Sequence, residues 1–175
     1  MEYEIVQAIL NGDTERYAEI VEQYQQLVAN LCYKLGGANI DVEETTQKVF
    51  VELYTSLHRF EYRSKLSTFI YKITANTVFK TLKNNSRYVK LSDYDSLMTE
   101  ACFADVKVMN DDRNKQLYKA MDKLNIEQKT ALTLCYFEEM SYKEVAETMG
   151  VTLAKVETLI FRAKKNLKKI LSDTI

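Results

Sequence analysis

The sequence contains no proline and no tryptophan, and its 175 residues include four glycines, three cysteines and one histidine. Because proline and glycine are the residues that most often interrupt helices, their scarcity favours long helices joined by short turns. The sequence also lacks an alternating polar and apolar pattern long enough to indicate β-strands. We therefore expect an all-α protein, with a length that suits one ordinary domain or two small ones.

The cysteines and the histidine do not have the spacing of a metal site or of a disulfide framework. Cys32 and Cys135 fall in apolar helical stretches and are expected to be small core residues, whereas Cys102 lies in a polar segment and could be exposed. A lone histidine such as His58 is usually structural or solvent-facing. Since a phosphate-binding loop and a nucleophile–base pair are also lacking, the sequence predicts no cofactor, no metal and no enzymatic activity.

No stretch of the sequence is long and apolar enough to cross a bilayer. The acidic N-terminal residues also lack the apolar core of a signal peptide. We therefore expect a cytoplasmic protein that does not insert into membranes.

Charge is unevenly distributed along the chain, although the formal net charge is −1. Residues 61–90 carry seven bases and one acid, and residues 151–175 carry six bases and two acids. Residues 1–60 and 91–112 are acidic, with ten acids to four bases and six acids to one base. Two separate basic blocks suggest two nucleic-acid contacts, whereas the acidic blocks suggest protein surfaces or a segment that stays off DNA.

The clearest motif is a helix–turn–helix over residues 141–165, SYKEVAETMGVTLAKVETLIFRAKK. Ser141 and Glu144 have the spacing of a capping box, Gly150 gives the turn its backbone freedom, and Thr152 can cap the second helix. The apolar positions expected to be buried in the first helix are Val145, Ala146 and Met149. Those of the second helix are Val156, Ile160, Ala163, Leu167 and Ile170.

The opposite face of that second helix is basic, with an aromatic side chain in its middle. The residues on it are Thr158, Phe161, Arg162, Lys165 and Lys169. A recognition helix in a DNA major groove needs cations for phosphates and side chains that reach base edges. The alternative is a solvated basic helix in a protein that does not bind DNA, but the agreement of turn, caps and face favours DNA contact.

Upstream, apolar periodicity predicts four helices. They cover residues 2–10, a stretch from Asp13 or Thr14 to Gly36-Gly37, a stretch from Asp41 to about Phe60, and about 66–82. A basic and aromatic connector, residues 58–67, precedes the fourth helix. Aromatics interleaved with cations suit single-stranded nucleic acid, and the alternative is a bundle core with a solvated basic end.

Residues 88–112 lose helical periodicity, become acidic, and are interpreted as a linker. Helical pattern resumes at Leu117, and a helix from about Glu127 leads into the helix–turn–helix. The expected organisation is therefore a helical domain over 1–87, the linker, and a second helical domain over 113–175.

In this order, the motifs resemble those of the extracytoplasmic-function sigma factors, small proteins that direct bacterial RNA polymerase to promoters. DVEETTQKVFVELYTSLHRF is similar to the polymerase-binding helix of that family, and STFIYKITANTVFKTLKNNSR to the helix that follows it. Residues 124–171 are similar to its C-terminal helix–turn–helix domain along their whole length. The resemblance implies a specificity subunit that binds core RNA polymerase, recognises promoter DNA and melts it. It also implies an anti-sigma factor as a partner.

The resemblance assigns roles to three groups of positions. The residues implied to contact or shape the polymerase-binding surface are Glu43, Glu44, Gln47 and Phe50. Those implied to capture the unwound minus-ten element are Phe60, Tyr62, Arg63, Lys65, Lys72, Asn76 and Lys80. Those implied to dock at the minus-thirty-five element are Lys155, Glu157, Thr158, Phe161, Arg162 and Lys165.

Some positions depart from the family pattern. The family often has a tryptophan near the position of Tyr54, and many members carry a glycine-threonine pair and a base where Ala154, Lys155 and Glu157 stand here. These departures make the promoter sequence unpredictable. Two alternatives stay open: a stand-alone helix–turn–helix transcriptional regulator, and a helical interaction module whose basic faces bind an acidic protein.

Overall fold

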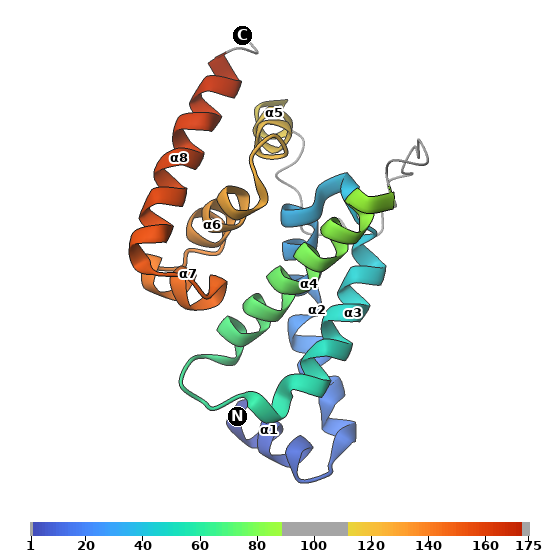
Figure 1. Cartoon of the computed structure of the whole chain (residues 1–175). Coiled ribbons are helices and arrows are strands. Elements are labelled where there is room, and N and C mark those ends of the chain that lie inside the picture. Colours follow the sequence, from blue (N-terminus) through green and yellow to red (C-terminus); the bar gives the residue numbers. More distant parts are fainter. Residues whose placement is uncertain (1, 89–111, 173–175) are drawn as a thin grey trace. The chain divides into compact units, whose positions relative to one another are not determined.

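The computed structural model describes residues 2–88 and 112–172, and every regular element in these two ranges is a helix (Figure 1). The chain divides into two compact units, Met1–Asp93 and Tyr94–Ile175. The prediction of an all-α protein built from two helical bodies is therefore confirmed. The boundaries proposed for the linker stay predictions, and Cys102 lies outside the described residues.

The first unit contains four α-helices linked by short turns. They are α1 (Glu2–Leu10), α2 (Tyr17–Gly36), α3 (Val42–Ser56) and α4 (Leu66–Tyr88). Single 3₁₀ turns at Thr14–Arg16, Gly37–Asn39 and Leu57–Arg59 join or extend them. Helix α3 begins as predicted, because the Asp41 side chain accepts a hydrogen bond from the Glu44 amide at 2.9 Å. Helix α4 continues beyond its predicted end at Leu82, and the Asn85 amide donates to the Asn39 carbonyl at 2.8 Å near that end.

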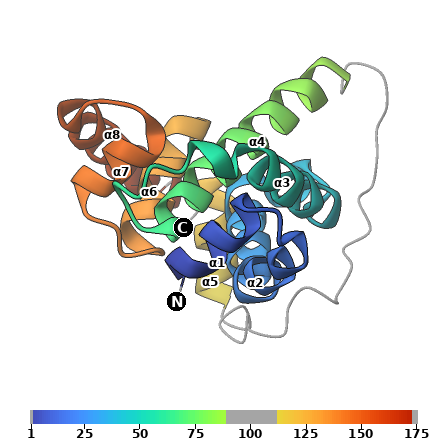
Figure 2. The same cartoon turned by 90° about the horizontal axis from the view of Figure 1, so that it is seen from below.

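Helices α2, α3 and α4 pack against one another around the core of this unit (Figures 1 and 2). Fully buried side chains from all three helices fill it: Val28, Leu31, Leu35, Val49, Leu53, Ile70 and Val78. Helix α4 packs on both α2 and α3, as its apolar residues on more than one side predicted. Helix α1 packs on α2 and on the turn at Leu57–Arg59.

Tyr17 fixes the start of α2 against the middle of α3. Its hydroxyl donates to the Phe50 carbonyl at 2.6 Å, and its ring lies edge-on to the Tyr54 ring with centroids 5.0 Å apart. Because the phenol is partly buried, its pKa is raised above the ordinary value for tyrosine. The hydroxyl therefore stays protonated and keeps donating to α3.

The second unit contains α5 (Asp112–Met121), α6 (Ile126–Tyr136), α7 (Tyr142–Met149) and α8 (Leu153–Ser172). The predicted capping box is present: the Ser141 hydroxyl accepts from the Glu144 amide, and the Glu144 carboxylate accepts from the Ser141 amide at 2.9 Å. Gly150 has φ 66° and ψ 35°, a left-handed conformation that favours glycine. Thr152 caps α8 by accepting from the Lys155 amide at 3.2 Å.

The core of the second unit follows the predicted apolar stripes with small differences. Val145, Ala146, Val156, Ile160, Ala163 and Leu167 are buried as expected. Met149 is half-buried, and Thr148 takes the buried place at the end of α7. Ile170 is half-buried near the end of α8, whereas Leu159 is buried and widens the stripe. A hydrogen bond from the Asn166 amide to Gln128, 3.1 Å long, ties α8 to α6.

Gly36 lets the chain turn tightly between α2 and α3. A Cβ atom at this position would lie 2.2 Å from Cδ1 and 2.4 Å from Cγ1 of Ile40, which is itself buried. We predict that Gly36→Ala destabilises the first unit by about 1–3 kcal/mol through overpacking. Hydrogen exchange of the most protected α2 and α4 amides measures this loss. The cost should shrink in an Ile40→Ala background, and an equal cost in both backgrounds would contradict the steric explanation.

Candidate nucleic-acid and protein interfaces

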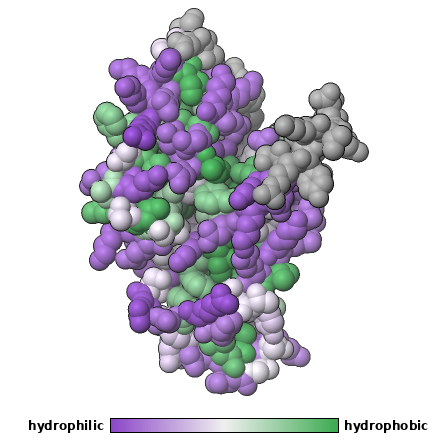
Figure 3. Space-filling view, in the orientation of Figure 1, coloured by the Kyte–Doolittle hydropathy of each residue, from purple (hydrophilic) through white to green (hydrophobic). Residues whose placement is uncertain are grey.

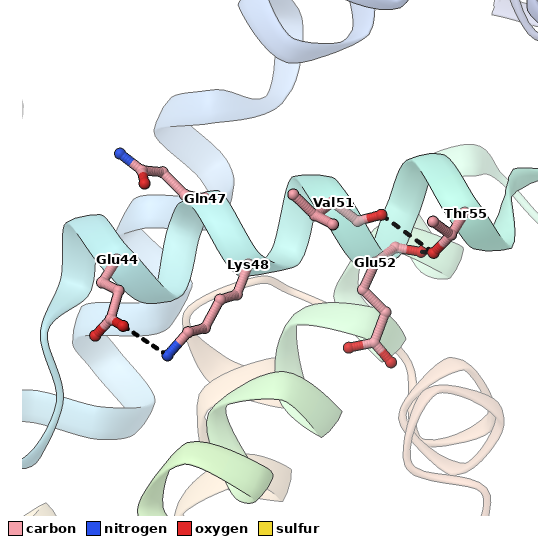
Figure 4. A pocket seen from close by; sticks show the side chains of 6 residues that line it. All are labelled: Glu44, Gln47, Lys48, Val51, Glu52 and Thr55. Carbon is pink, nitrogen blue, oxygen red and sulfur yellow. Dashed lines mark hydrogen bonds and ion pairs between the residues drawn. The ribbon is translucent and has the colours of Figure 1, made fainter.

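One broad face of α3 is exposed and mixes polar with apolar side chains. Six of its residues line a shallow hollow: Glu44, Gln47, Lys48, Val51, Glu52 and Thr55 (Figure 4). Lys48 pairs with Glu44 at 2.9 Å within this face. Val51 is 66% exposed, and Tyr54, one turn further along, is 43% exposed. These two side chains place an apolar patch beside Gln47. We call Glu43, Glu44, Gln47, Lys48, Val51 and Tyr54 the α3 face.

The four residues that the resemblance assigned to polymerase binding differ in exposure. Glu43, Glu44 and Gln47 are exposed on the α3 face. Phe50 is buried, with 9% of its surface exposed, so it can shape this face from beneath but cannot form its outer surface. The exposed Val51 was not assigned from the sequence. The sequence feature that could have indicated its exposure is that this apolar residue lies outside the predicted buried stripe of the helix.

Most exposed apolar residues of the described chain stand alone or in pairs. In the view of Figure 3, hydrophilic residues cover much of the surface, and hydrophobic residues emerge in separate patches. The large apolar side chains that are exposed are Tyr3, Leu10, Val51, Tyr54, Tyr136, Leu153 and Phe161. Among the described helices, none combines the length and apolar character that spanning a bilayer requires.

The loop of residues 60–65, between the turn at Leu57–Arg59 and α4, combines aromatic rings with exposed cations. Phe60 is buried, and its ring lies 4.7 Å from that of Tyr62 and 5.4 Å from that of Phe69, measured between centroids. Arg63 and Lys65 are exposed, and Arg63 pairs with neighbouring Glu61 at 2.9 Å. The loop therefore has an aromatic base and a cationic rim.

Three predicted residues, Lys72, Asn76 and Lys80, follow this loop on the exposed side of α4. Their spacing of four residues places them on neighbouring turns of the helix. Lys80 differs from the other two because its ammonium group pairs with Glu52 of α3 at 2.8 Å. The same carboxylate accepts from the Thr77 hydroxyl at 2.9 Å, so Glu52 links α3 to α4.

The exposed face of α8 presents the residues predicted for duplex DNA. Phe161 is 69% exposed, and Glu157, Thr158, Arg162 and Lys165 are exposed with it. Lys155 is also exposed, but it pairs with Glu127 of α6 at 3.1 Å. The basic face predicted from helical periodicity is therefore present, with its aromatic ring in solvent.

Within the part of the chain that the structure describes, no group of three or more histidine, cysteine or acidic side chains is arranged to hold a metal ion. Cys32 is buried and Cys135 is half-buried. These cysteines therefore serve as packing residues. The exposed surfaces described above carry charged, hydrogen-bonding and aromatic side chains.

Comparison with known families identifies the family to which this chain belongs. The sigma-70 region 2 family matches residues 20–88, and the sigma-70 region 4 family matches residues 114–167. The chain is 25% identical to the extracytoplasmic-function (ECF) RNA polymerase sigma factor SigW of Bacillus subtilis, in an alignment covering 96% of this chain and 95% of SigW. The chain belongs to the ECF sigma factors.

Two further comparisons agree with this assignment. The ECF RNA polymerase sigma factor SigE of Mycolicibacterium smegmatis is 28% identical, with 88% of this sigma factor and 61% of SigE aligned. The fold is similar to that of the sigma factor RpoE, solved in complex with the anti-sigma factor NepR from Bartonella quintana. The TM-score is 0.69 at 16% identity, over 89% of this chain and 96% of RpoE.

The family matches follow the helices closely. Region 2 covers α2, α3 and α4, and region 4 covers α5 to α8 except for their outermost residues. The family predicted from the order of the sequence motifs is therefore confirmed. Helix α1 lies outside both matched ranges.

The link between α3 and α4 makes the stability of this sigma factor depend on pH. The hydrogen bond from Lys80 lowers the pKa of Glu52 below its ordinary value, and that from Thr77 lowers it further, while partial burial opposes both. Because this pKa is depressed on folding, the stabilisation is present above the unfolded pKa of about 4.3 and is lost as pH falls through the folded value.

We predict that Glu52→Gln lowers the stability of the first unit at pH 7 and that this deficit shrinks as pH falls below the unfolded pKa of about 4.3. Hydrogen exchange of protected α2 and α4 amides at several pH values measures the deficit. The matched background is Lys80→Ala, in which Glu52→Gln should cost less at pH 7. A deficit that is independent of pH would show that charge pairing is not its cause.

Proposed function

We propose that this sigma factor binds core RNA polymerase through the α3 face and directs it to promoters by holding two DNA elements. One element is held as single strands by the first unit, and the other as duplex by the second. The observation that carries this proposal is the presence of separate exposed cationic surfaces on region 2 and region 4. In this proposal the protein works in the cytoplasm and is not an enzyme: it supplies binding energy rather than a chemical step.

The exposed face of α8 would enter the major groove at the minus-thirty-five element. Arg162 can make two hydrogen bonds to a guanine, and Glu157 can accept from a cytosine amino group. Phe161 can pack on a thymine methyl group, while Lys155 and Lys165 supply charge for phosphates. These contacts anchor the protein to duplex DNA upstream of the melted region.

The loop of residues 60–65 and α4 would hold the unwound minus-ten element. We call Tyr62, Arg63, Lys65, Lys72 and Asn76 the single-strand surface, with Phe60 supporting it from the core and Lys80 contributing charge at its far end. Opening a base pair costs about 1–2 kcal/mol in lost stacking. Stacking a base on an aromatic side chain recovers about 1–3 kcal/mol. A surface that captures a few bases therefore suffices to hold the strand open.

The α3 face suits a protein partner better than DNA. It carries the acidic side chains of Glu43 and Glu44 beside the apolar patch of Val51 and Tyr54, and an acidic surface repels phosphates. A polar rim around exposed apolar side chains is the usual composition of a protein interface. Core RNA polymerase is the partner that the family implies for this surface.

An anti-sigma factor is the second protein partner of this proposal. RpoE, which shares the fold, was solved in complex with one. In the present chain, the α3 face and the α8 face both expose apolar side chains that such a partner can cover. A partner bound to both faces would block polymerase and promoter together.

An electrophoretic mobility shift assay with and without core polymerase tests the proposed function. The sigma factor should shift promoter DNA strongly only when core polymerase is present. Tight, sequence-specific binding of duplex DNA by the free chain, with no affinity for polymerase, would instead support a stand-alone transcriptional regulator.

We predict that Arg162→Ala weakens promoter binding by the holoenzyme roughly 5- to 100-fold, the range expected for one lost bidentate base contact. The affinity for core polymerase should not change, because α8 and the α3 face belong to different units. Lys168→Ala, which removes one positive charge further along α8, is the matched control and should have a smaller effect. Loss of polymerase binding by Arg162→Ala would contradict the assignment of roles to the two units.

We predict that Gln47→Ala combined with Val51→Ser lowers the affinity for core polymerase roughly tenfold or more, as the loss of central interface side chains does. Both side chains are exposed, so the melting temperature should be unchanged. Fluorescence anisotropy of labelled protein titrated with polymerase measures the affinity. Gln25→Ala, an exposed change on α2, is the control, and equal affinities for the two variants would rule out the α3 face as the contact.

A further inference from the structure

Helix α1 reaches the loop of residues 60–65, although it lies outside the residues that match region 2. Tyr3 and Gln7 are four residues apart and therefore share one side of this helix. The Gln7 amide donates to the Tyr62 hydroxyl at 2.7 Å. The ring of Tyr3 contacts the ring of Tyr62 with centroids 4.7 Å apart and planes inclined by 52°. Two side chains of α1 thus meet one tyrosine of the loop.

The backbone of Tyr62 explains why these contacts matter. Its φ of 57° lies in the left-handed region, which bulky residues rarely adopt without support from their surroundings. The support comes from the Phe60 ring, 4.7 Å away, and from Tyr3 and Gln7 of α1. Helix α1 therefore helps to set the shape of the loop.

The rings of Phe60, Tyr62 and Tyr3 lie in contact one after another and are increasingly exposed. Phe60 is buried, Tyr62 is half-buried and Tyr3 is 59% exposed. The exposed cations Arg63 and Lys65 belong to the same loop as Tyr62, and Arg63 pairs with Glu61 at 2.9 Å. Two acids flank Tyr3 in α1: Glu2 accepts hydrogen bonds from the hydroxyl of Tyr24 and from the amide of Gln23, the latter 3.1 Å long, and Glu4 is exposed. An exposed ring beside cations matches a flat base attached to a phosphate.

We propose that α1 completes the single-strand surface, with Tyr3 stacking on an unpaired base and Gln7 positioning Tyr62 beside it. This inference rests on the proposed function, since it takes the melted strand as the occupant of the loop. Tyr3 is then a binding residue that touches DNA. Gln7 is a positioning residue that acts through the Tyr62 hydroxyl.

Stacking by Tyr3 can be tested with holoenzyme and forked promoter DNA in which the minus-ten segment is unpaired on one strand at a time. Tyr3→Leu keeps an apolar side chain but removes the ring, and Tyr3→Phe keeps the ring. We expect roughly tenfold weaker binding for Tyr3→Leu and wild-type binding for Tyr3→Phe. Leu10→Ala, at the other end of α1, is the control and should bind as wild type.

Abasic sites placed one at a time along the unpaired strand then locate the stacked base. At one position, removing the base should abolish the difference between wild type and Tyr3→Leu. Equal binding of wild type and Tyr3→Leu to intact forked DNA would overturn the inference. A difference that persists at every abasic position would also overturn it, because the ring would then not act through a base.

The positioning role of Gln7 has a separate readout. Gln7→Leu should speed hydrogen exchange of the amides in residues 60–65 and weaken binding to forked DNA. Tyr62→Phe added to Gln7→Leu should cause no further loss, since both changes remove the same hydrogen bond. Unchanged exchange and binding in Gln7→Leu would overturn the positioning role.

The outcomes also separate this inference from the proposed function. If the wild-type chain forms no complex with core polymerase, or if its holoenzyme does not retain forked DNA, the proposed function fails and the inference fails with it. If wild-type holoenzyme retains forked DNA and the Tyr3 variants match it, only the inference fails.

Discussion

The burial of one apolar stripe on each helix is the constraint on which the functional surfaces depend. On α8, Val156, Ile160 and Ala163 are buried, and they fix the rotation of the helix about its axis. Because successive residues advance by about 100°, Phe161 and Arg162 must then face away from the core. On α3, burial of Val49 and Leu53 leaves the opposite side, with Gln47 and Val51, in solvent. Packing within each unit therefore determines which sides of α3 and α8 are exposed.

In the first unit, the carboxylate of Glu52 links the α3 face to the exposed side of α4. Glu52 borders the hollow on α3 and pairs with Lys80 on α4, which also carries Lys72 and Asn76. Tyr17 braces α3 from the other direction by donating to its backbone at Phe50. These polar contacts hold the two helices in register, while the apolar core supplies most of the stability. The geometry of one face is consequently not independent of the other.

Sequence reasoning succeeded where structure is set by residues close together in the chain. The capping box at Ser141, the left-handed turn at Gly150 and the helix start at Asp41 are local, so a short pattern determines each of them. The helical stripes were predictable for the same reason, although Met149 on α7 is less buried, and Leu159 on α8 more buried, than expected.

Features that arise from contacts distant in sequence were not predicted. No local pattern indicates that α1 contacts residue 62, or that this tyrosine adopts a left-handed backbone, since both depend on how the helices pack. The exposure of Val51 and the burial of Phe50 likewise depend on which side of α3 meets α2. The exposed residues of α8 were easier to predict, because the strong contrast between its apolar and basic sides leaves little ambiguity about its orientation.

The exposed apolar side chains of this sigma factor have a consequence when it is not bound to polymerase or DNA. Phe161 keeps 69% of its surface in water, and Tyr54 and Val51 are also left uncovered. Exposed apolar side chains promote non-specific association with other proteins, so a partner that covers these positions would keep the unbound sigma factor from associating. In the proposed function, a partner that covers the same side chains competes with promoter DNA and core polymerase for them. One sigma factor molecule then cannot bind the covering partner and the polymerase at the same time. By mass action, the relative amounts of partner and polymerase determine which complex prevails.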